Sequence, residues 1–195
     1  MKKLILTITG VLLLLASASA EGRVFLSAGA NLIRPADAGF RSIYGGGAVY
    51  PELAAAVRIA GGFCLTGSFG MFAKNGTTPN LGLETRAKQT YFTMGIGYLY
   101  RVSRLICVEA RTGLAGLSFR EDALDSTVEG QKSGLMAEGG LLYMDEDGQF
   151  FLGLKLGLLS ANVDDLASEI VGPQSVRLGG FKVSVSFGFQ LFGIR

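Results

Sequence analysis

The feature that most constrains this chain is a strict alternation of residue types near its carboxyl end. In GGFKVSVSFGFQLFGIR (179–195), apolar residues occupy every second position: Phe181, Val183, Val185, Phe187, Phe189 and Leu191. The positions between them are small or polar: Lys182, Ser184, Ser186, Gly188 and Gln190. A period of two is that of a β-strand, and the two faces of this strand must meet different environments.

The same alternation recurs along the chain, for example in QFFLGLKLGLL (149–159) and YFTMGIGYLY (91–100). We predict eight strands, with ends uncertain by about two to four residues. They cover residues 23–34, 46–60, 62–74, 87–101, 104–119, 132–144, 149–160 and 176–192. The chain is therefore expected to be all-β.

The predicted links alternate in length. Tight links follow the second, fourth and sixth strands, at 60–62, 101–104 and 145–148, and long ones follow the others, at 35–45, 75–86, 120–131 and 161–175. In an up-and-down antiparallel barrel this alternation places all short turns at one end and all long loops at the other.

Composition narrows the class of protein. Residues 1–20 have two early lysines, an apolar run and Ala18-Ser19-Ala20, which predicts a cleaved signal peptide and one domain over 21–195. Removing that segment takes away two of 18 basic residues and none of the 16 acidic ones, so the mature chain is neutral. It therefore lacks the excess of basic residues that indicates nucleic-acid binding. No later segment has the roughly 18 consecutive apolar residues that a transmembrane helix needs.

The two predicted faces differ in a way that favours a membrane barrel. One face carries large apolar residues, and the other carries mostly glycine, serine and threonine with a few charges. The second face is too poor in charge for a solvated exterior but suits the narrow lumen of an eight-stranded barrel. The apolar face is therefore expected to point at lipid, and closure of the sheet removes the edges that hydrocarbon cannot solvate.

With these features the chain resembles the small eight-stranded outer-membrane barrels of the OmpA-transmembrane-domain and OmpX kind. Family members usually end on an aromatic residue, whereas this chain has Phe189 and Phe192 near its end and stops at Arg195. The resemblance implies the outer membrane of a Gram-negative-type bacterium. It also implies contact with lipid, lipopolysaccharide and the barrel insertion machinery.

Seven charged residues fall on the predicted lumen face: Glu52, Arg58, Glu109, Arg111, Glu138, Lys155 and Lys182. Charges inside a narrow barrel must pair with one another or contact water, because an unpaired buried charge costs several kcal/mol. They are expected to form either an internal salt-bridge plug or the charged constriction of a small pore. Glu138→Lys is expected to weaken the barrel.

Catalytic residues are not evident. The chain has no histidine, the usual proton acceptor for a serine nucleophile, and Ser184 and Ser186 have only Lys182 nearby as a conceivable base. No spacing indicates a metal or a cofactor. Cys64 and Cys107 are expected to be two buried thiols, because the intervening strand holds their backbones too far apart for a disulfide.

The sequence thus predicts a non-enzymatic, porin-like membrane barrel with a structural or surface-interaction role through its outer loops; it does not identify an extracellular partner. One alternative is a narrow channel or hydrophobic-ligand conduit across the membrane. A second is a soluble periplasmic barrel that binds a lipid, which requires the two faces to be inverted.

Overall fold

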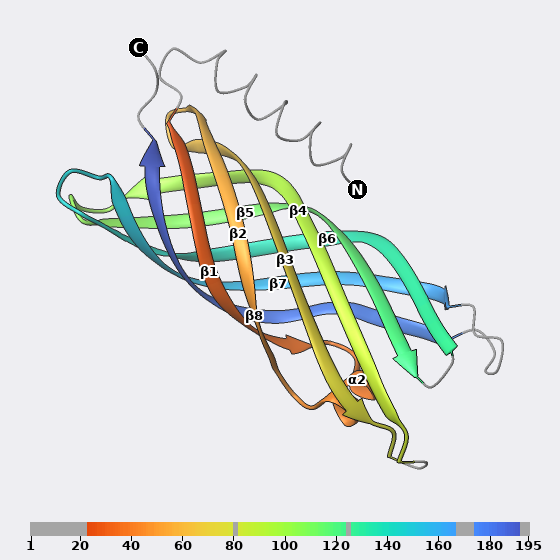
Figure 1. Cartoon of the computed structure of the whole chain (residues 1–195). Helices are drawn as coiled ribbons and strands as arrows, with labels where there is room; N and C mark the ends of the chain where they lie inside the picture. Colours follow the sequence, from red (N-terminus) through yellow and green to blue (C-terminus); the bar gives the residue numbers. More distant parts are fainter. Residues whose placement is uncertain (1–22, 80–81, 124–125, 167–173, 192–195) are drawn as a thin grey trace.

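The computed structural model describes residues 23–79, 82–123, 126–166 and 174–191. Its strands are β1 (Val24–Pro35), β2 (Ala48–Ala60), β3 (Phe63–Thr77), β4 (Glu84–Arg101), β5 (Ile106–Ala123), β6 (Ser126–Met144), β7 (Phe150–Leu166) and β8 (Gln174–Leu191). Each strand pairs antiparallel with the next, and β8 pairs with β1, which closes the barrel (Figure 1). The predicted fold is therefore confirmed. The expected signal peptide and the final residues 192–195 lie outside the described ranges.

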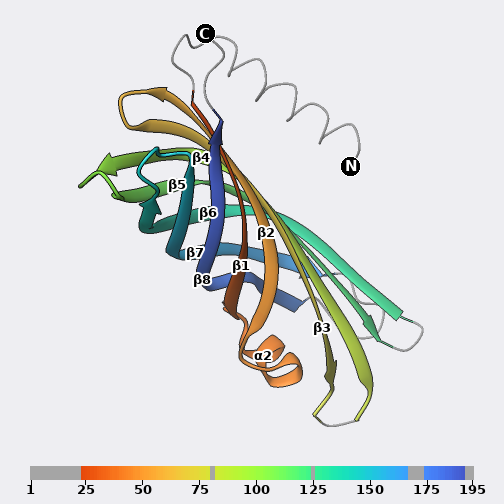
Figure 2. The same cartoon turned by 60° about the vertical axis from the view of Figure 1, so that its left-hand side comes forward.

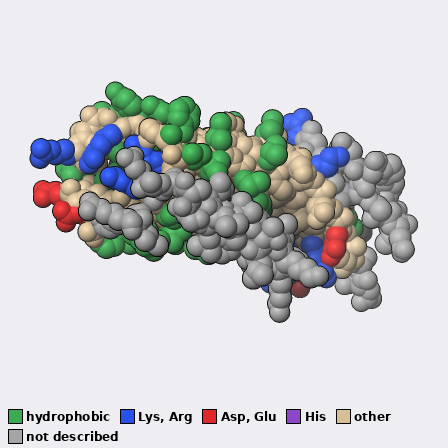
Figure 3. Space-filling model, turned by 90° about the horizontal axis from the view of Figure 1, so that it is seen from above, with side chains coloured by type: hydrophobic (Ala, Val, Ile, Leu, Met, Phe, Trp, Pro, Cys, Tyr) green, Lys and Arg blue, Asp and Glu red, His purple; other side chains and the backbone are tan. Residues whose placement is uncertain are grey.

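The orientation of the strand faces is also confirmed. On β8, Phe181 and Phe187 are 45% and 55% exposed on the outer wall, whereas Lys182 and Ser184 between them are buried in the lumen. In the space-filling view, hydrophobic side chains cover much of the visible wall, and charged ones lie toward its two ends (Figure 3). The exterior is apolar, so the inverted faces of a soluble lipid-binding barrel are not found.

The short links gather at one end of the barrel, as predicted. Residues 61–62, 102–105 and 145–149 join β2 to β3, β4 to β5 and β6 to β7. The last of these turns is fixed by Asp145, whose carboxylate accepts a hydrogen bond from the Phe150 amide at 3.0 Å, and by Gly148 at a φ of 68°. We call this end the turn end and the opposite one the outer end.

At the outer end the structure corrects the predicted loops. The segment 120–131 was expected to be a long loop, but β5 runs to Ala123 and β6 begins at Ser126, so only residues 124–125 link them. The β3–β4 hairpin likewise extends to Thr77 and Glu84. Both hairpins reach further at this end than β1 and β2 do (Figure 2). Their ends have polar residues on both faces, which removes the alternation that marks a strand in the sequence.

The predicted link 35–45 contains a short helix, α2 (Ala38–Tyr44). Asp37 caps it by accepting a hydrogen bond from the Phe40 amide at 2.7 Å, and Gly45 ends it at a φ of 83°. Phe40 and Tyr44, four residues apart, lie on one face and are buried at the outer end of the barrel. Among the described residues, no helix is long and apolar enough to cross a membrane.

Candidate functional site

The lumen holds a layer of six connected charges, which we call the charged layer. Its members are Glu52 on β2, Glu109 and Arg111 on β5, Glu138 on β6, Lys155 on β7 and Lys182 on β8. The antiparallel register brings them to similar heights: Arg111 is paired directly with Glu138, and Lys182 lies opposite Gly157, which is itself paired with Glu138. Six of the seven charges predicted for the lumen therefore meet.

Arg111 is the centre of the charged layer. It lies 3.7 Å from Glu52 and 3.6 Å from Glu109, and it also contacts Glu138. Lys182 closes a ring, because it binds Glu52 at 2.6 Å and pairs with Glu138 as well. Lys155 is attached to this ring through Glu109 at 3.4 Å.

The charged layer is neutral and almost fully withdrawn from solvent. It contains three carboxylates and three cations, and the side chains of Lys182, Glu138 and Arg111 are 0%, 1% and 3% exposed. Each buried charge thus has at least one opposite partner, which such burial requires. The whole arrangement is held by side chains from five strands and depends on closure of the barrel.

Two tyrosines that the sequence reasoning did not single out complete this layer. The Tyr91 hydroxyl donates to Glu52 Oε2 at 2.6 Å, and the Lys182 ammonium lies 5.5 Å from the centre of the Tyr91 ring. Tyr50 packs edge-on against Tyr91 with ring centroids 5.3 Å apart. Alternation along β4 and β2 puts both tyrosines on the lumen face, so the same pattern that identified the charges could have found them.

Arg58 does not join the charged layer. It lies near the turn end of β2, half-buried, where its Nε donates to the Gly61 carbonyl. The pairing of β2 with β3 shifts register between Arg58 and Ala60, just before the turn at 61–62. None of the ion pairs found between described residues includes it.

Glycines on neighbouring strands make room for the large side chains of the lumen. Gly157 is paired with Glu138, and a Cβ atom at Gly157 would lie 2.5 Å from Glu138 Cγ. Gly140 stands in the same relation to Lys155, where a Cβ would lie 2.8 Å from Lys155 Cγ. Gly70 is paired with Tyr91, and a Cβ atom at Gly70 would collide with the Tyr91 ring. Each of these side chains lies flat across the bare backbone of the next strand.

Apolar layers close the lumen on both sides of the charges. Toward the turn end lies the inner cluster, formed by Phe25, Cys107, Leu142, Met144 and Phe151. Toward the outer end lies the outer cluster: Ile33, Phe40, Tyr44, Ala48, Tyr50, Phe72, Ala87, Tyr91, Ala115, Leu117, Phe119, Met136, Leu159, Ala161 and Leu178. Between the charged layer and the inner cluster is a cavity of about 30 Å³, a volume that holds about two water molecules.

Helix α2 forms the outermost part of this seal. Phe40 lies with ring centroids 6.3 Å from Phe72 and 6.4 Å from Phe119. The Tyr44 hydroxyl donates to Glu121 at 2.6 Å and lies 2.6 Å from the Thr85 hydroxyl. Burial, followed by the bond to the Glu121 carboxylate, raises the pKa of Tyr44 above its usual range.

Comparison with known proteins bears on the fold. No family profile matches the chain, and no curated protein matches it in sequence. OprG of Pseudomonas aeruginosa is similar in structure, with a TM-score of 0.68 and 14% identity over 89% of this chain and 98% of OprG. The chain has the fold of the small outer-membrane β-barrels.

Two other solved structures agree. Ail, the attachment invasion locus protein of Yersinia pestis, matches with a TM-score of 0.56 and 13% identity over 88% of this chain and 99% of Ail. The Neisserial surface protein A matches with a TM-score of 0.54 and 12% identity over 88% of this chain and 97% of that one. At these identities the likeness concerns the fold.

The serines and thiols of the lumen have structural surroundings. The Ser184 hydroxyl bonds to Asn31, and the neighbouring Lys182 is held by two carboxylates. In the described structure these contacts of the Lys182 ammonium are with carboxylates and not with a serine hydroxyl. Cys64 and Cys107 are free, buried thiols on strands separated by β4.

Proposed function

We propose that this protein spans an outer membrane as a closed, non-conducting barrel whose outer end serves a structural or surface-interaction role. The observation that carries the proposal is the filled lumen, with a neutral charged layer between two apolar clusters. The outward faces of the strands support the membrane placement. Leu152, Leu154 and Leu156 on β7 are each more than half exposed on the outer wall, which suits a lipid-facing band.

Aromatic residues support the same placement. Tyr98, Tyr100 and Tyr143 lie outward near the turn end and are 43%, 60% and 58% exposed. Tyrosines at that height suit one membrane–water interface, where the ring contacts hydrocarbon and the hydroxyl contacts water. The short turns would then lie on the periplasmic side, with the outer end on the cell surface.

The outer end presents paired strands as a surface for contacts with a partner molecule. The β3–β4 and β5–β6 hairpins extend past the apolar wall, and the second is braced by Arg120, which lies 3.0 Å from Asp122 and 2.9 Å from Glu129. One structural neighbour, Ail, has been solved in complex with the heparin analogue sucrose octasulfate. Paired strands at this end favour a role in which a preformed surface, rather than a flexible loop, meets a partner.

We propose no enzymatic activity. The sequence contains no histidine, and the lumen serines have no base within the described structure. The lumen is also filled, which leaves a substrate no path to those hydroxyls. In this proposal the partners are the outer-membrane lipids, lipopolysaccharide, the insertion machinery and an extracellular molecule.

Two measurements test the proposal together. The mature protein, refolded in detergent, should migrate differently on a gel before and after boiling, because a closed membrane barrel resists the detergent until heated. The same preparation in a planar lipid bilayer should give no steady conductance. Absence of the gel shift would contradict a membrane-spanning barrel, and stable conductance steps would contradict a closed lumen.

A conduit for hydrophobic ligands is the second candidate. Pairing of β6 with β7 stops at Leu135 and Ser160, so the β5–β6 and β7–β8 hairpins separate toward the outer end (Figure 2). Met136 and Leu159 of the outer cluster lie just inside this point. A conduit predicts that a spin-labelled fatty acid added to reconstituted barrels is immobilised beside Met136 and crosses the membrane faster than through lipid alone.

A further inference from the structure

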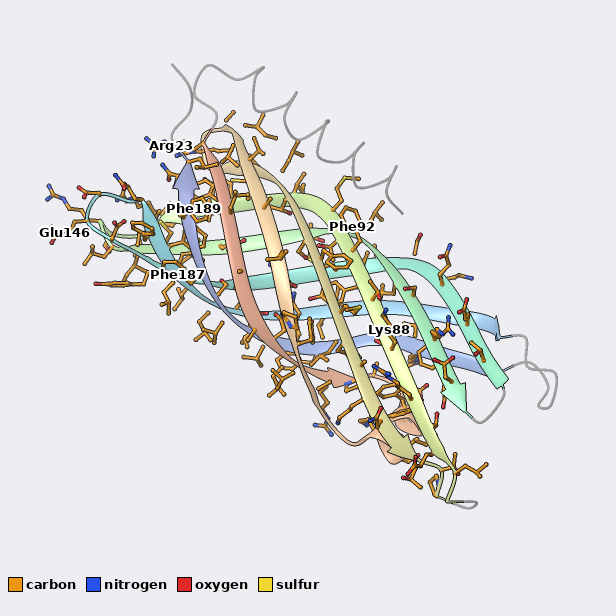
Figure 4. The ribbon with its side chains drawn as sticks, in the orientation of Figure 1. Arg23, Lys88, Phe92, Glu146, Phe187 and Phe189 are labelled. Atoms are coloured by element: carbon orange, nitrogen blue, oxygen red, sulfur yellow. The ribbon has the colours of Figure 1, made fainter. Side chains whose placement is uncertain are left out.

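The outward charges beside the apolar wall share one sign on several strands. Moving from the wall toward the outer end, the first outward charge is a cation on four strands and the acid Glu129 on β6. The four cations are Arg34 on β1, Lys88 on β4, Arg120 on β5 and Arg177 on β8, all exposed. On β4, Lys88 lies four residues beyond the outward Phe92 (Figure 4). If the barrel spans a membrane as proposed, these cations lie at the height of the outer lipid headgroups.

Lys88 and Arg120 are an unusual pair. They are directly opposite each other on β4 and β5, a position in which like charges destabilise a sheet. Arg120 is neutralised by Asp122 and Glu129, at 3.0 Å and 2.9 Å. Lys88, in contrast, takes part in none of the ion pairs between described residues. Within the part of the chain that the structure describes, Lys88 is thus left without a bound anion.

A polar hollow lies immediately beyond this pair. Its volume is about 400 Å³, and it is lined by Asn75, Gly76, Thr77, Glu84, Thr85, Arg86 and Asp122. Arg86 is the next outward residue after Lys88 on β4 and is paired with Asn75 on one side and Asp122 on the other. The lining thus offers an amide, hydroxyls, carboxylates and a guanidinium, the groups that bind sugar hydroxyls and phosphate.

We propose that this surface binds the phosphorylated saccharide headgroup of an outer-leaflet glycolipid, namely lipopolysaccharide. A headgroup phosphate lies against Lys88 and Arg86, and a sugar ring occupies the hollow. The acyl chains run down the outer wall over Phe92 and Met94, of which Met94 is 57% exposed. The inference rests on the proposed membrane placement, and it assigns to that placement a specific lipid and a specific site.

The test compares two single substitutions in barrels reconstituted into phosphatidylcholine vesicles and titrated with fluorescent lipopolysaccharide. Lys88→Gln should weaken binding about fivefold, since one basic side chain near an anionic membrane surface contributes about that factor. Arg104→Gln removes one exposed cation at the turn end and should leave the affinity unchanged. Equal affinities of wild type and Lys88→Gln, or equal losses in both variants, would overturn the site.

Two further arms separate the phosphate from the sugar. With enzymatically dephosphorylated lipopolysaccharide, wild type and Lys88→Gln should bind alike. Thr77→Phe, which fills the hollow, should weaken binding of lipopolysaccharide but not of phosphatidylglycerol added to the same reconstituted barrels. If Thr77→Phe has no effect on lipopolysaccharide, the site recognises charge alone and the saccharide part of the proposal is wrong.

Failure of this site can be told apart from failure of the proposed function. All three variants should retain the gel shift on boiling, because the exchanged side chains lie outside the lumen. A wild-type barrel that shifts on boiling but does not prefer lipopolysaccharide refutes the site alone. A wild-type chain without that shift refutes the membrane placement first.

Discussion

Glu138→Gln tests whether the charged layer stabilises the barrel. The substitution keeps the shape of the side chain and removes one of the three negative charges of the charged layer. Two cations, Arg111 and Lys182, lose a partner whose side chain is only 1% exposed. The charged layer then carries one uncompensated positive charge that is buried.

The expected magnitude follows from the contacts that remain. Removing one partner of a buried ion pair costs about 3–5 kcal/mol. Lys182 keeps Glu52 at 2.6 Å, and Arg111 keeps Glu52 at 3.7 Å and Glu109 at 3.6 Å. We therefore expect a loss near the lower limit, about 3 kcal/mol in the free energy of unfolding.

A second substitution should restore part of that loss. Lys182→Gln alone is also expected to be destabilising, whereas Glu138→Gln combined with Lys182→Gln returns the lumen to neutrality. The double variant should be no less stable than either single one, which corresponds to a coupling energy of about 3 kcal/mol. Glu146→Gln, the same chemical change at an exposed turn residue (Figure 4), is the control and should be within about 0.5 kcal/mol of wild type.

The assay is urea unfolding of barrels folded into phospholipid vesicles, followed by far-ultraviolet circular dichroism. The chain has no tryptophan, so its six tyrosines provide the fluorescence signal for a second probe. Two results would refute the reasoning. One is a Glu138→Gln barrel as stable as Glu146→Gln, and the other is a double variant whose loss equals the sum of the single losses.

Three further predictions address the packing of the lumen. Gly157→Ala should lower the free energy of unfolding by about 1–3 kcal/mol, because the added methyl group overlaps a buried side chain; Gly139→Ala, whose Cβ would lie 3.7 Å from its nearest neighbour, should be neutral in the same unfolding assay. Wild-type stability should fall as pH rises above about 10, because the unfolded chain then releases the tyrosine proton that folded Tyr44 retains. Tyr44→Phe should flatten that decline in unfolding free energy measured against pH. Cys64 and Cys107 should resist maleimide while the barrel is folded and react after boiling, as mass spectrometry will show; labelling of the folded barrel would mean that the lumen is open.

The barrel itself could be predicted from the sequence because every strand crosses the same two environments. Alternation such as Phe181-Lys182-Val183-Ser184 reports a wall with hydrocarbon on one side and a packed lumen on the other. The alternation is lost at the outer end, where the two faces of a strand no longer meet different environments. Beyond Arg120 most residues on both faces of the β5–β6 hairpin are polar. The pattern therefore predicts a loop over 120–131, although β5 and β6 remain paired to Ala123 and Ser126.

Helix α2 was missed for a related reason. Its seven residues are too few for a periodic pattern, and a glycine inside a helix, here Gly39, disfavours one. The local signals were nevertheless present, in the Asp37 cap and in the spacing of Phe40 and Tyr44. A cap followed by two aromatics four residues apart could have indicated a short helix with one buried face.

For the candidate site, alternation along each strand predicted which charges face the lumen but not which of them meet. That depends on register: Arg111 lies opposite Glu138 because the β5–β6 hairpin closes through residues 124–125, a link that the sequence pattern did not reveal. The glycines also acquire their meaning only through register. Gly157 and Gly140 look alike in the sequence, yet one accommodates Glu138 and the other Lys155.

The balance of charge in the lumen argues for a plug over a pore. A selective pore presents a ring of one sign to passing ions, and binding at each site must be weak enough for the ion to leave. Here each carboxylate is already bound by a cation of the protein, with Lys182 shared by Glu52 and Glu138 and Lys155 held by Glu109. An entering ion would have to replace an internal partner, and the cavity beside the charged layer has room for only about two water molecules. The same contacts that would obstruct conduction join five strands across the lumen, so stability and closure are expected to be lost together when the charged layer is broken.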